Sequence, residues 1–157
     1  MALKNRNPQW NVSGSDISEN AIASAKKSSV LNEIDVSFSC LDALKQTLEQ
    51  GSVDIIVSNP PYIPEVEKER MADHVINHEP SLALFVDNEE PLIFYEAIAK
   101  TAFSSLTNEG KIYFEIHENF GPQMTELLIK FGFSNVQIKK DLQGKERMIR
   151  GQKLNTK

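Results

Sequence analysis

The strongest chemical signal in the sequence is the tetrapeptide Asn59-Pro60-Pro61-Tyr62, which directly follows the apolar run Val53–Ser58. Two successive prolines fix the backbone and stiffen the loop. The Asn59 side-chain amide and the Pro60 carbonyl are then acceptors at fixed positions, and Tyr62 offers a flat aromatic face. This set suits a planar –NH2 group, which donates two hydrogen bonds in its own plane. Because holding both hydrogens aims the nitrogen at an electrophile, the loop predicts group transfer to an amino group. The alternative is a rigid turn that only ends a strand.

Acidic residues follow two other expected strands, at Asp16 and Asp42. A carboxylate is a natural bidentate acceptor for a diol, but a lone Asp after a strand is also a common helix cap, so both interpretations stay open. The histidines show no metal-ligand spacing with cysteine or carboxylates, and the sequence therefore predicts no metal site. They are His74, His78 and His117.

Strand-like and helix-like patterns alternate along the chain. The expected strands are Trp10–Ser15, Asp35–Cys40, Val53–Ser58, a strand from Gly110 through Ile116, Phe133–Lys139 and Arg147–Arg150. The expected helices are one capped by Ser18, a short one over Asp42–Glu49, one with Pro91 in its first turn, and one opened by Pro122 and stopped by Gly132. The order predicts an α/β domain with a mostly parallel sheet.

Particular segments carry further expectations. The continuous β-branched run Val53–Ser58 is typical of a strand covered on both faces. Three prolines within Asn59–Pro64 exclude regular structure there, and Glu65–Glu90 is the least regular stretch. The last two strands are too close for a parallel crossover, so they form an antiparallel hairpin. Ligands of such sheets bind at the carboxyl ends of the strands, here the loops at Asp16, Asp42, Asn59 and Glu115.

The composition bounds the class of protein. The chain has 157 residues, of which 40% are hydrophobic and 25% charged, which fits one domain with a real core. No apolar run approaches the roughly 18 residues of a membrane helix, and no signal peptide is visible. The single cysteine, Cys40, excludes a disulfide framework, is expected to be a small core residue and favours a reducing, cytoplasmic compartment.

Charge is unevenly distributed. The net charge of −5 argues against a broad electrostatic grip on nucleic acid. Residues 65–96 hold nine acidic and two basic residues, and residues 139–157 hold seven basic and two acidic ones. The simpler interpretation is a solvated acidic loop followed by a basic tail; the sharper one is that the acidic stretch lines the approach to a basic partner.

Several segments together carry a resemblance to a known family. The stretch VSNPPYIP resembles the Asn-Pro-Pro-Tyr motif of S-adenosylmethionine-dependent methyltransferases that modify planar amino groups. The further matches are His78–Leu84, Leu92–Tyr95, Glu115-Ile116 and Asp141-Leu142-Gln143-Gly144-Lys145-Glu146-Arg147. The set is similar to the HemK/PrmC family, which methylates the glutamine side-chain amide in the Gly-Gly-Gln motif of peptide-chain release factors. The resemblance covers about Asp16 to Gly151.

The resemblance implies a Rossmann-like class I methyltransferase sheet, S-adenosyl-L-methionine as cofactor and release factors as protein substrates, with no membrane or direct nucleic-acid partner. It assigns the glutamine-binding, catalytic loop to Asn59, Pro60, Pro61 and Tyr62. It assigns the cofactor ribose to Asp16, with Ile17 packing on adenine. Asp42 and Ala43 match the pair beside the adenine amino group, and Asn59 also borders the cofactor.

The sequence departs from the family pattern in its glycines. No two glycines are closer than seven residues, so no Gly-x-Gly loop exists in this sequence. Residues 1–157 are therefore expected to be the C-terminal part of a catalytic domain, without strand one, the glycine-rich loop and the helical N-terminal domain. Strand one normally lies between the strands that end at Asp16 and Asn59. Smaller departures are Pro91 and the run His117–Phe120.

Two alternatives remain beside the release-factor methyltransferase. One is an adenine-N6 or guanine-N2 methyltransferase of nucleic acid, since the tetrapeptide alone is shared with such enzymes. The other is a catalytically incompetent fragment or binding module, which the absent glycine loop favours.

Overall fold

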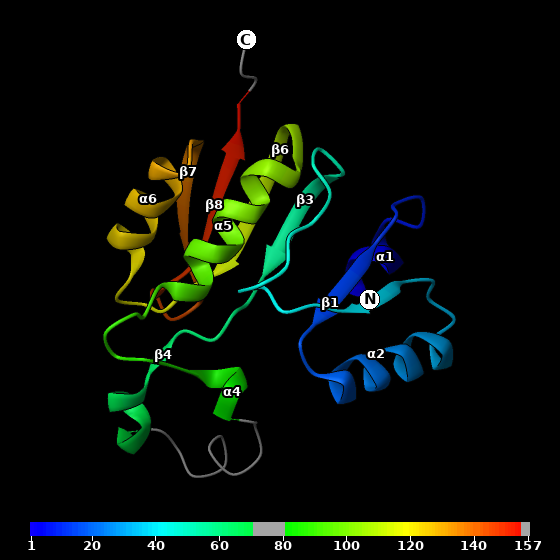
Figure 1. Ribbon diagram of the computed structural model, residues 1–157, viewed down its shortest axis with the longest axis horizontal. Helices are drawn as coiled ribbons and strands as arrows, with labels where there is room; N and C mark the ends of the chain where they lie inside the picture. Colours follow the sequence, from blue (N-terminus) through cyan, green and yellow to red (C-terminus); the bar gives the residue numbers. More distant parts are fainter. Residues whose placement is uncertain (71–80, 155–157) are drawn as a thin grey trace. The chain divides into compact units, whose positions relative to one another are not determined.

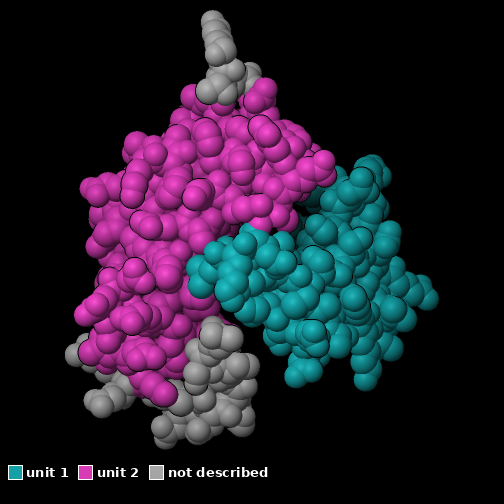
Figure 2. Space-filling view, in the orientation of Figure 1, with its two compact units in different colours: residues 1–46 teal, residues 47–157 magenta. Residues whose placement is uncertain are grey.

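A computed structural model describes residues 1–70 and 81–154 of the chain. They divide into two compact units, residues 1–46 and residues 47–157, shown in different colours in Figure 2. No helix in the part of the chain that the structure describes is both long enough and apolar enough to cross a membrane.

The first unit contains a parallel strand pair and a helix that contacts it. Its elements are α1 (Ala2–Arg6), β1 (Ser13–Asp16), α2 (Glu19–Leu31) and β2 (Ser37–Cys40). Strand β1 pairs with β2 in parallel, with Asp16 opposite Cys40. The Ser18 hydroxyl accepts a hydrogen bond from the Ala21 N–H at 3.2 Å, so the predicted cap of α2 is confirmed.

Two expectations for this unit are wrong. Residues 42–49 form no helix but a turn at residues 43–45, in which the Asp42 carbonyl accepts the N–H groups of Lys45 and Gln46. So short a segment does not repay the cost of nucleating a helix. Cys40 is exposed rather than a core residue, and its thiol lies 3.3 Å from the Ile17 carbonyl. The reason is that the strand pair is scarcely covered: Ile22, at 8% exposure, is the one buried hydrophobic side chain among the described residues of this unit.

The second unit is built on a four-stranded sheet (Figure 1). Its strands are β3 (Val53–Ser58), β6 (Leu106–Glu115), β7 (Phe133–Lys140) and β8 (Glu146–Lys153), in the order β3-β6-β8-β7. Strand β3 is parallel to β6, whereas β8 is antiparallel to both β6 and β7. The α/β prediction and the antiparallel C-terminal hairpin are therefore confirmed. Strand β6 begins earlier than the predicted Gly110.

Helices α5 (Ile93–Ser105) and α6 (Gly121–Lys130) contact each other and the sheet, with α5 on β6 and α6 on β7 and β8. Both helices were predicted, and their apolar side chains supply part of the core, although α5 begins two residues after Pro91. Gly132 ends α6 with a φ of +91°, a left-handed conformation that favours glycine. The buried core consists of Tyr95, Ala99, Ala102, Leu106, Ile112, Phe114, Ile116, Met124, Leu127, Leu128, Phe133 and Ile149.

Short elements connect β3 to α5. They are β4 (Ile63–Pro64), the 3-10 helix η1 (Glu65–Arg70), α4 (Ser81–Leu84) and β5 (Phe85–Val86), with β4 parallel to β5. The expectation of no regular structure up to Pro64 is thus wrong at its last two residues. His74, His78 and the matched Glu79-Pro80 lie in residues 71–80, outside the described residues.

Strand β3 is an edge strand with one open face, which corrects the expectation that both its faces are covered. Ile55 is 40% and Val57 60% exposed, whereas Ile56 packs against the core. Among the described residues β3 pairs with β6 alone, and α5 and α6 pack mainly on β6, β7 and β8, so little covers the Ile55 and Val57 side chains. In the described part of the chain β1 and β3 belong to different sheets. A further strand between them stays a prediction.

Candidate active site

The carboxyl ends of β3 and β6 bring two of the predicted loops together. The register pairs Ser58 with Phe114, so the loop that begins at Asn59 lies beside Glu115. The Tyr62 hydroxyl donates a hydrogen bond of 2.8 Å to Glu115 Oε1. This contact joins residues that are far apart in the sequence, and it closes the Asn59–Tyr62 loop onto the end of the sheet.

Burial differs between the residues of the Asn59–Tyr62 loop. Pro60 is buried, Pro61 and Tyr62 are half-buried, and Asn59 is exposed. The Asn59 side-chain amide and the Pro60 carbonyl have no hydrogen-bond partner among the described residues. The loop is thus anchored by its apolar and aromatic residues, while the exposed Asn59 amide and the Pro60 carbonyl keep unused acceptor capacity among the described residues.

Glu115 is itself held by the core. The hydroxyl of fully buried Tyr95 donates to the Glu115 main-chain carbonyl at 2.8 Å. At the next residue, the Ile116 N–H donates to the Arg147 carbonyl at 2.9 Å, and Arg147 Nη1 donates back to the Ile116 carbonyl at 3.4 Å. Helix α5 and strand β8 therefore fix the backbone on which the Glu115 carboxylate is carried.

The two tyrosines of this cluster keep their protons. Burial raises the pKa of Tyr62, the Glu115 carboxylate raises it further, and Arg147 opposes the shift. Burial also raises the pKa of Tyr95 well above its ordinary value, with smaller contributions from Tyr62 and Glu115. Both hydroxyls are consequently hydrogen-bond donors throughout the range in which the protein would be assayed.

His117 links the loop region to the segment after it. It is buried, its Nε2 lies 3.1 Å from Glu67 Oε2 on η1, and its Nδ1 accepts the Asn119 N–H at 3.2 Å. Its ring meets Tyr62 edge-on with centroids 6.1 Å apart. Since Nδ1 accepts the Asn119 N–H and Nε2 makes the contact with Glu67, His117 links η1 to the end of β6.

The base of the β7–β8 hairpin completes the surroundings. The Asp141 carboxylate accepts the N–H groups of Gln143 (2.8 Å) and Lys145 (3.0 Å), and it lies 3.6 Å from Arg147 Nε. Lys145 in turn pairs with Glu118 at 2.9 Å. These contacts hold the pKa of Asp141 and of Glu118 below the ordinary carboxyl range. Part of the basic tail is thus paired within the fold.

In the first unit, the ends of β1 and β2 bring the other predicted residues together. The Asp16 carbonyl accepts the Leu41 N–H at 3.0 Å, so the turns at Asp16-Ile17 and Asp42-Ala43 are neighbours. One Asp16 oxygen accepts the Ser18 N–H, and Ile17 is 51% exposed. Lys45 lies 3.0 Å from Asp42 Oδ2 and, with the Leu44 N–H, lowers the pKa of Asp42.

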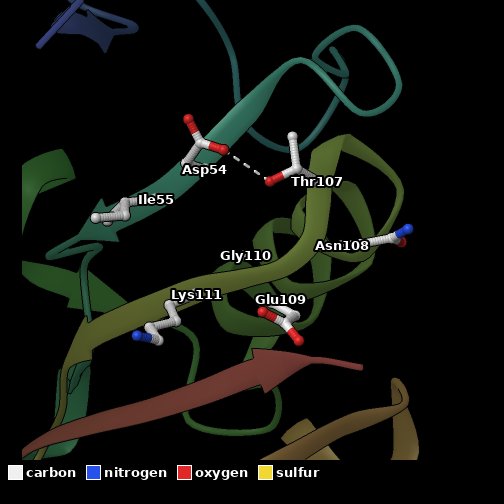
Figure 3. A pocket seen from close by; sticks show the side chains of 7 residues that line it. All are labelled: Asp54, Ile55, Thr107, Asn108, Glu109, Gly110 and Lys111. Atoms are coloured by element: carbon white, nitrogen blue, oxygen red, sulfur yellow. Dashed lines mark hydrogen bonds between the residues drawn. The ribbon is translucent and has the colours of Figure 1, made fainter. Parts of the chain in front are cut away.

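The described residues also form an open hollow at the other end of β3, opposite to the Asn59 loop (Figure 3). Figure 3 shows Thr107 turned toward Asp54, whose carboxylate accepts the Thr107 hydroxyl at 2.8 Å. The hollow contains none of the predicted site residues; its lining is Asp54, Ile55, Thr107, Asn108, Glu109, Gly110 and Lys111. Over residues 1–70 and 81–154, no three His, Cys, Asp or Glu side chains group as metal ligands do.

Sequence reasoning missed the residues that support the loop. In the sequence, Tyr95 and Arg147 stand out only as members of matched motifs. Glu67 is one of the acidic residues between positions 65 and 96. The spacing of these residues does not reveal their contacts with the loop region, because the contacting residues belong to elements that are far apart in the sequence. The one available signal was that Asn59 and Glu115 lie at the carboxyl ends of two expected parallel strands. The carboxyl ends of parallel strands meet at the same edge of a sheet.

Comparison with known proteins gives a consistent result. Residues 1–84 match the family model described as "Methyltransferase small domain". The chain is 41% identical over 150 residues to a protein named release factor glutamine methyltransferase from Flavobacterium psychrophilum, covering 96% of this chain and 53% of that protein. A protein of the same name from Bacteroides thetaiotaomicron is 40% identical over 150 residues, with 95% and 54% covered. The chain thus spans about half the length of the curated relatives it matches.

Solved structures share the fold. A crystal structure titled as a methyltransferase from Pyrococcus furiosus superposes with a TM-score of 0.71 at 16% identity, covering 98% of this chain and 68% of that one. At so low an identity the likeness concerns the fold alone. It confirms the Rossmann-like architecture that the family resemblance implied.

Proposed function

Because this chain belongs to the methyltransferase small domain family, we propose that it is part of an S-adenosylmethionine-dependent enzyme that methylates the side-chain amide of a glutamine. The proposed substrate is the glutamine of the Gly-Gly-Gln motif in peptide-chain release factors. The names of the relatives at 40–41% identity support this substrate. We further propose that residues 1–157 correspond to the C-terminal part of the catalytic domain.

One observation carries the proposal. The Asn59–Tyr62 loop lies at the carboxyl end of β3 and is tied down through Tyr62; the Asn59 side chain is exposed, and the Pro60 carbonyl has no hydrogen-bond partner among the described residues. Two acceptors at fixed positions match the two in-plane hydrogens of a primary amide. A protein glutamine side chain presents such a group at the end of a flexible stem, which can reach into a loop of this kind.

The loop would act by orientation. The nitrogen of an amide is a weak nucleophile, because its lone pair is delocalised into the carbonyl. Asn59 and Pro60 would hold its two hydrogens, and the ring of Tyr62 would limit its rotation, so that the nitrogen faces the methyl donor. The proton that leaves the nitrogen on alkylation is acidic, and no strong general base is required among these residues.

The residues of the first unit fit the nucleoside part of S-adenosylmethionine. Asp16 uses one carboxylate oxygen for the Ser18 N–H and keeps acceptor capacity for a ribose diol. The exposed Ile17 side chain offers an apolar surface to adenine, and Asp42, with Ala43 beside it, offers an acceptor for the adenine amino group. When bound, the sulfonium group supplies an activated methyl. The single cysteine, a free thiol, is compatible with the reducing cytoplasm in which we place this reaction.

Methyl transfer from labelled S-adenosylmethionine to a purified release factor tests the proposal, with the full-length protein that carries this sequence. We expect labelling of the wild-type release factor and none of a variant in which the Gly-Gly-Gln glutamine is replaced by alanine. Absence of transfer to the wild type, or equal transfer to both, would refute the substrate. Labelling of ribosomal or transfer RNA instead would favour the nucleic-acid alternative, against which the net charge of −5 counts.

Calorimetry of residues 1–157 with S-adenosylmethionine addresses the binding-module alternative. Micromolar affinity would contradict an incompetent fragment. No detectable heat would support it, because the sequence holds no Gly-x-Gly loop for the methionine part of the cofactor.

A further inference from the structure

We propose that Glu115 is a positioning residue for the methyl transfer, acting through the hydroxyl of Tyr62. The inference rests on the proposed function. It adds a residue whose side chain touches neither the substrate amide nor the cofactor in the assignments above, and whose part is to set the position of the Asn59–Tyr62 loop.

The backbone of Glu115 is held by the buried core of the second unit. Glu115 is the last residue of β6, between buried Phe114 and buried Ile116. Tyr95, at 0% exposure, donates to its carbonyl, and β8 pairs with the strand up to Glu115 itself, opposite Met148. A carboxylate carried on such a backbone is a fixed reference point for anything that binds it.

The Tyr62 hydroxyl needs a hydrogen-bond partner, and Glu115 provides it. The hydroxyl is half-buried and donates at 2.8 Å to Glu115 Oε1, a charge-assisted bond. The bond joins the last residue of the tetrapeptide to the sheet. At the other end, Asn59 directly follows β3. The loop is therefore tied to two neighbouring strands, once by the chain itself and once by Glu115.

Glu115 thereby affects the position of the Asn59–Tyr62 loop rather than the groups that bind the substrate. Pro60 and Pro61 transmit the position of Tyr62 to the rest of the loop, because their fixed φ angles leave few ways to absorb a shift. Without Glu115 the tyrosine would swing toward water, and the two acceptors that face the amide would move with it. A displacement of about 1 Å at such a site costs up to roughly 100-fold in rate.

The test uses the full-length protein, with E115A, E115Q, Y62F and the double variant Y62F/E115A. We expect E115A to lower kcat by roughly 10- to 100-fold with little change in the KM for S-adenosylmethionine. A glutamine at position 115 keeps an oxygen that can accept the hydrogen bond from the Tyr62 hydroxyl, so E115Q should retain most of the rate. Because both residues act through one hydrogen bond, the double variant should be no slower than the slower single variant.

The matched control is E118A, which removes a carboxylate three residues away that pairs with Lys145 and not with Tyr62. It should keep kcat within about twofold of the wild type. Rates of E115A within twofold of the wild type, or losses of Y62F and E115A that multiply in the double variant, would overturn the assignment.

A second readout needs no substrate. Glu115 raises the pKa of Tyr62, so the Tyr62 absorbance titration in E115A should move to lower pH, with Y62F identifying its contribution. An unmoved titration would refute the contact. If the wild-type enzyme transfers no methyl group while this titration does shift, the proposed function fails and the Tyr62–Glu115 contact stands.

Discussion

Asn59 and Tyr62 stand at the two ends of the same tetrapeptide in opposite surroundings. Asn59 is exposed and without a partner among the described residues, whereas Tyr62 is half-buried and bonded to Glu115. The difference fits the proposal that Asn59 serves a ligand while Tyr62 holds the loop. Residue types alone predict this role for Asn59, because an amide after a strand and before two prolines has few local uses. The partner of Tyr62 was not.

Replacing Asn59 by alanine tests this separation. We expect N59A, in the full-length protein, to reduce kcat by roughly 100-fold, because the amide nitrogen of the substrate loses one of its two acceptors. The free energy of unfolding should change little, since the side chain is exposed.

The control is N108A, which removes another exposed asparagine at the opposite end of the sheet, in the hollow of Figure 3. It should leave kcat at the wild-type value. An N59A enzyme with wild-type turnover would contradict the amide-positioning role.

At the scale of elements, the turn of the β7–β8 hairpin is held by the Asp141 carboxylate. Asp141 accepts two backbone N–H groups across the turn and lies beside Arg147. The turn was predictable from Gly144, whose φ is +84°. The pairing of Arg147 with the end of β6 was not, since it depends on β8 lying between β6 and β7.

The stability that Asp141 contributes should depend on pH. Its pKa is lowered in the folded state, first by the Lys145 N–H, so its contribution is present above its unfolded pKa and is lost as the pH falls through the folded value. We expect the difference in urea midpoint between the wild type and D141A to be full above about pH 5 and to shrink below about pH 4.

The variant E126A, which removes an exposed carboxylate from α6, gives the effect of losing a surface charge without a cap. A D141A effect that stays constant from pH 7 to pH 3 would show that the carboxylate does not act through its charge.

At the scale of the whole molecule, the two units differ in their cores. The buried hydrophobic residues of the described chain belong to the second unit, apart from Ile22. A two-stranded sheet with one helix buries too little apolar surface to be stable by itself. The sequence did not reveal this difference in burial, because the apolar residues of α2 are the same whether or not another element covers them.

Hydrogen exchange should report the difference directly. We expect the amides of β1 and β2 to exchange much faster than those of β6 and β8, because local opening costs less where fewer apolar contacts are broken. Equal protection of the two strand pairs would mean that the first unit has a stabilising contact beyond its own core. Added S-adenosylmethionine should slow exchange at Asp16 and Asp42 if these residues bind it.

The sequence by itself determined most of the local elements, and it predicts the chemistry at the loop after β3. Ser18, Pro122 and Gly132 set helix ends, alternation set the strands, and the two prolines set a stiff loop after β3. Such signals act over a few residues, so they are legible along the chain. Only the tertiary structure decided that Asp42 lies in a turn, that Cys40 and Val57 are exposed, and that Glu115 receives the Tyr62 hydroxyl. These outcomes depend on which strands are neighbours and what covers them, and residue spacing within one segment carries no record of either.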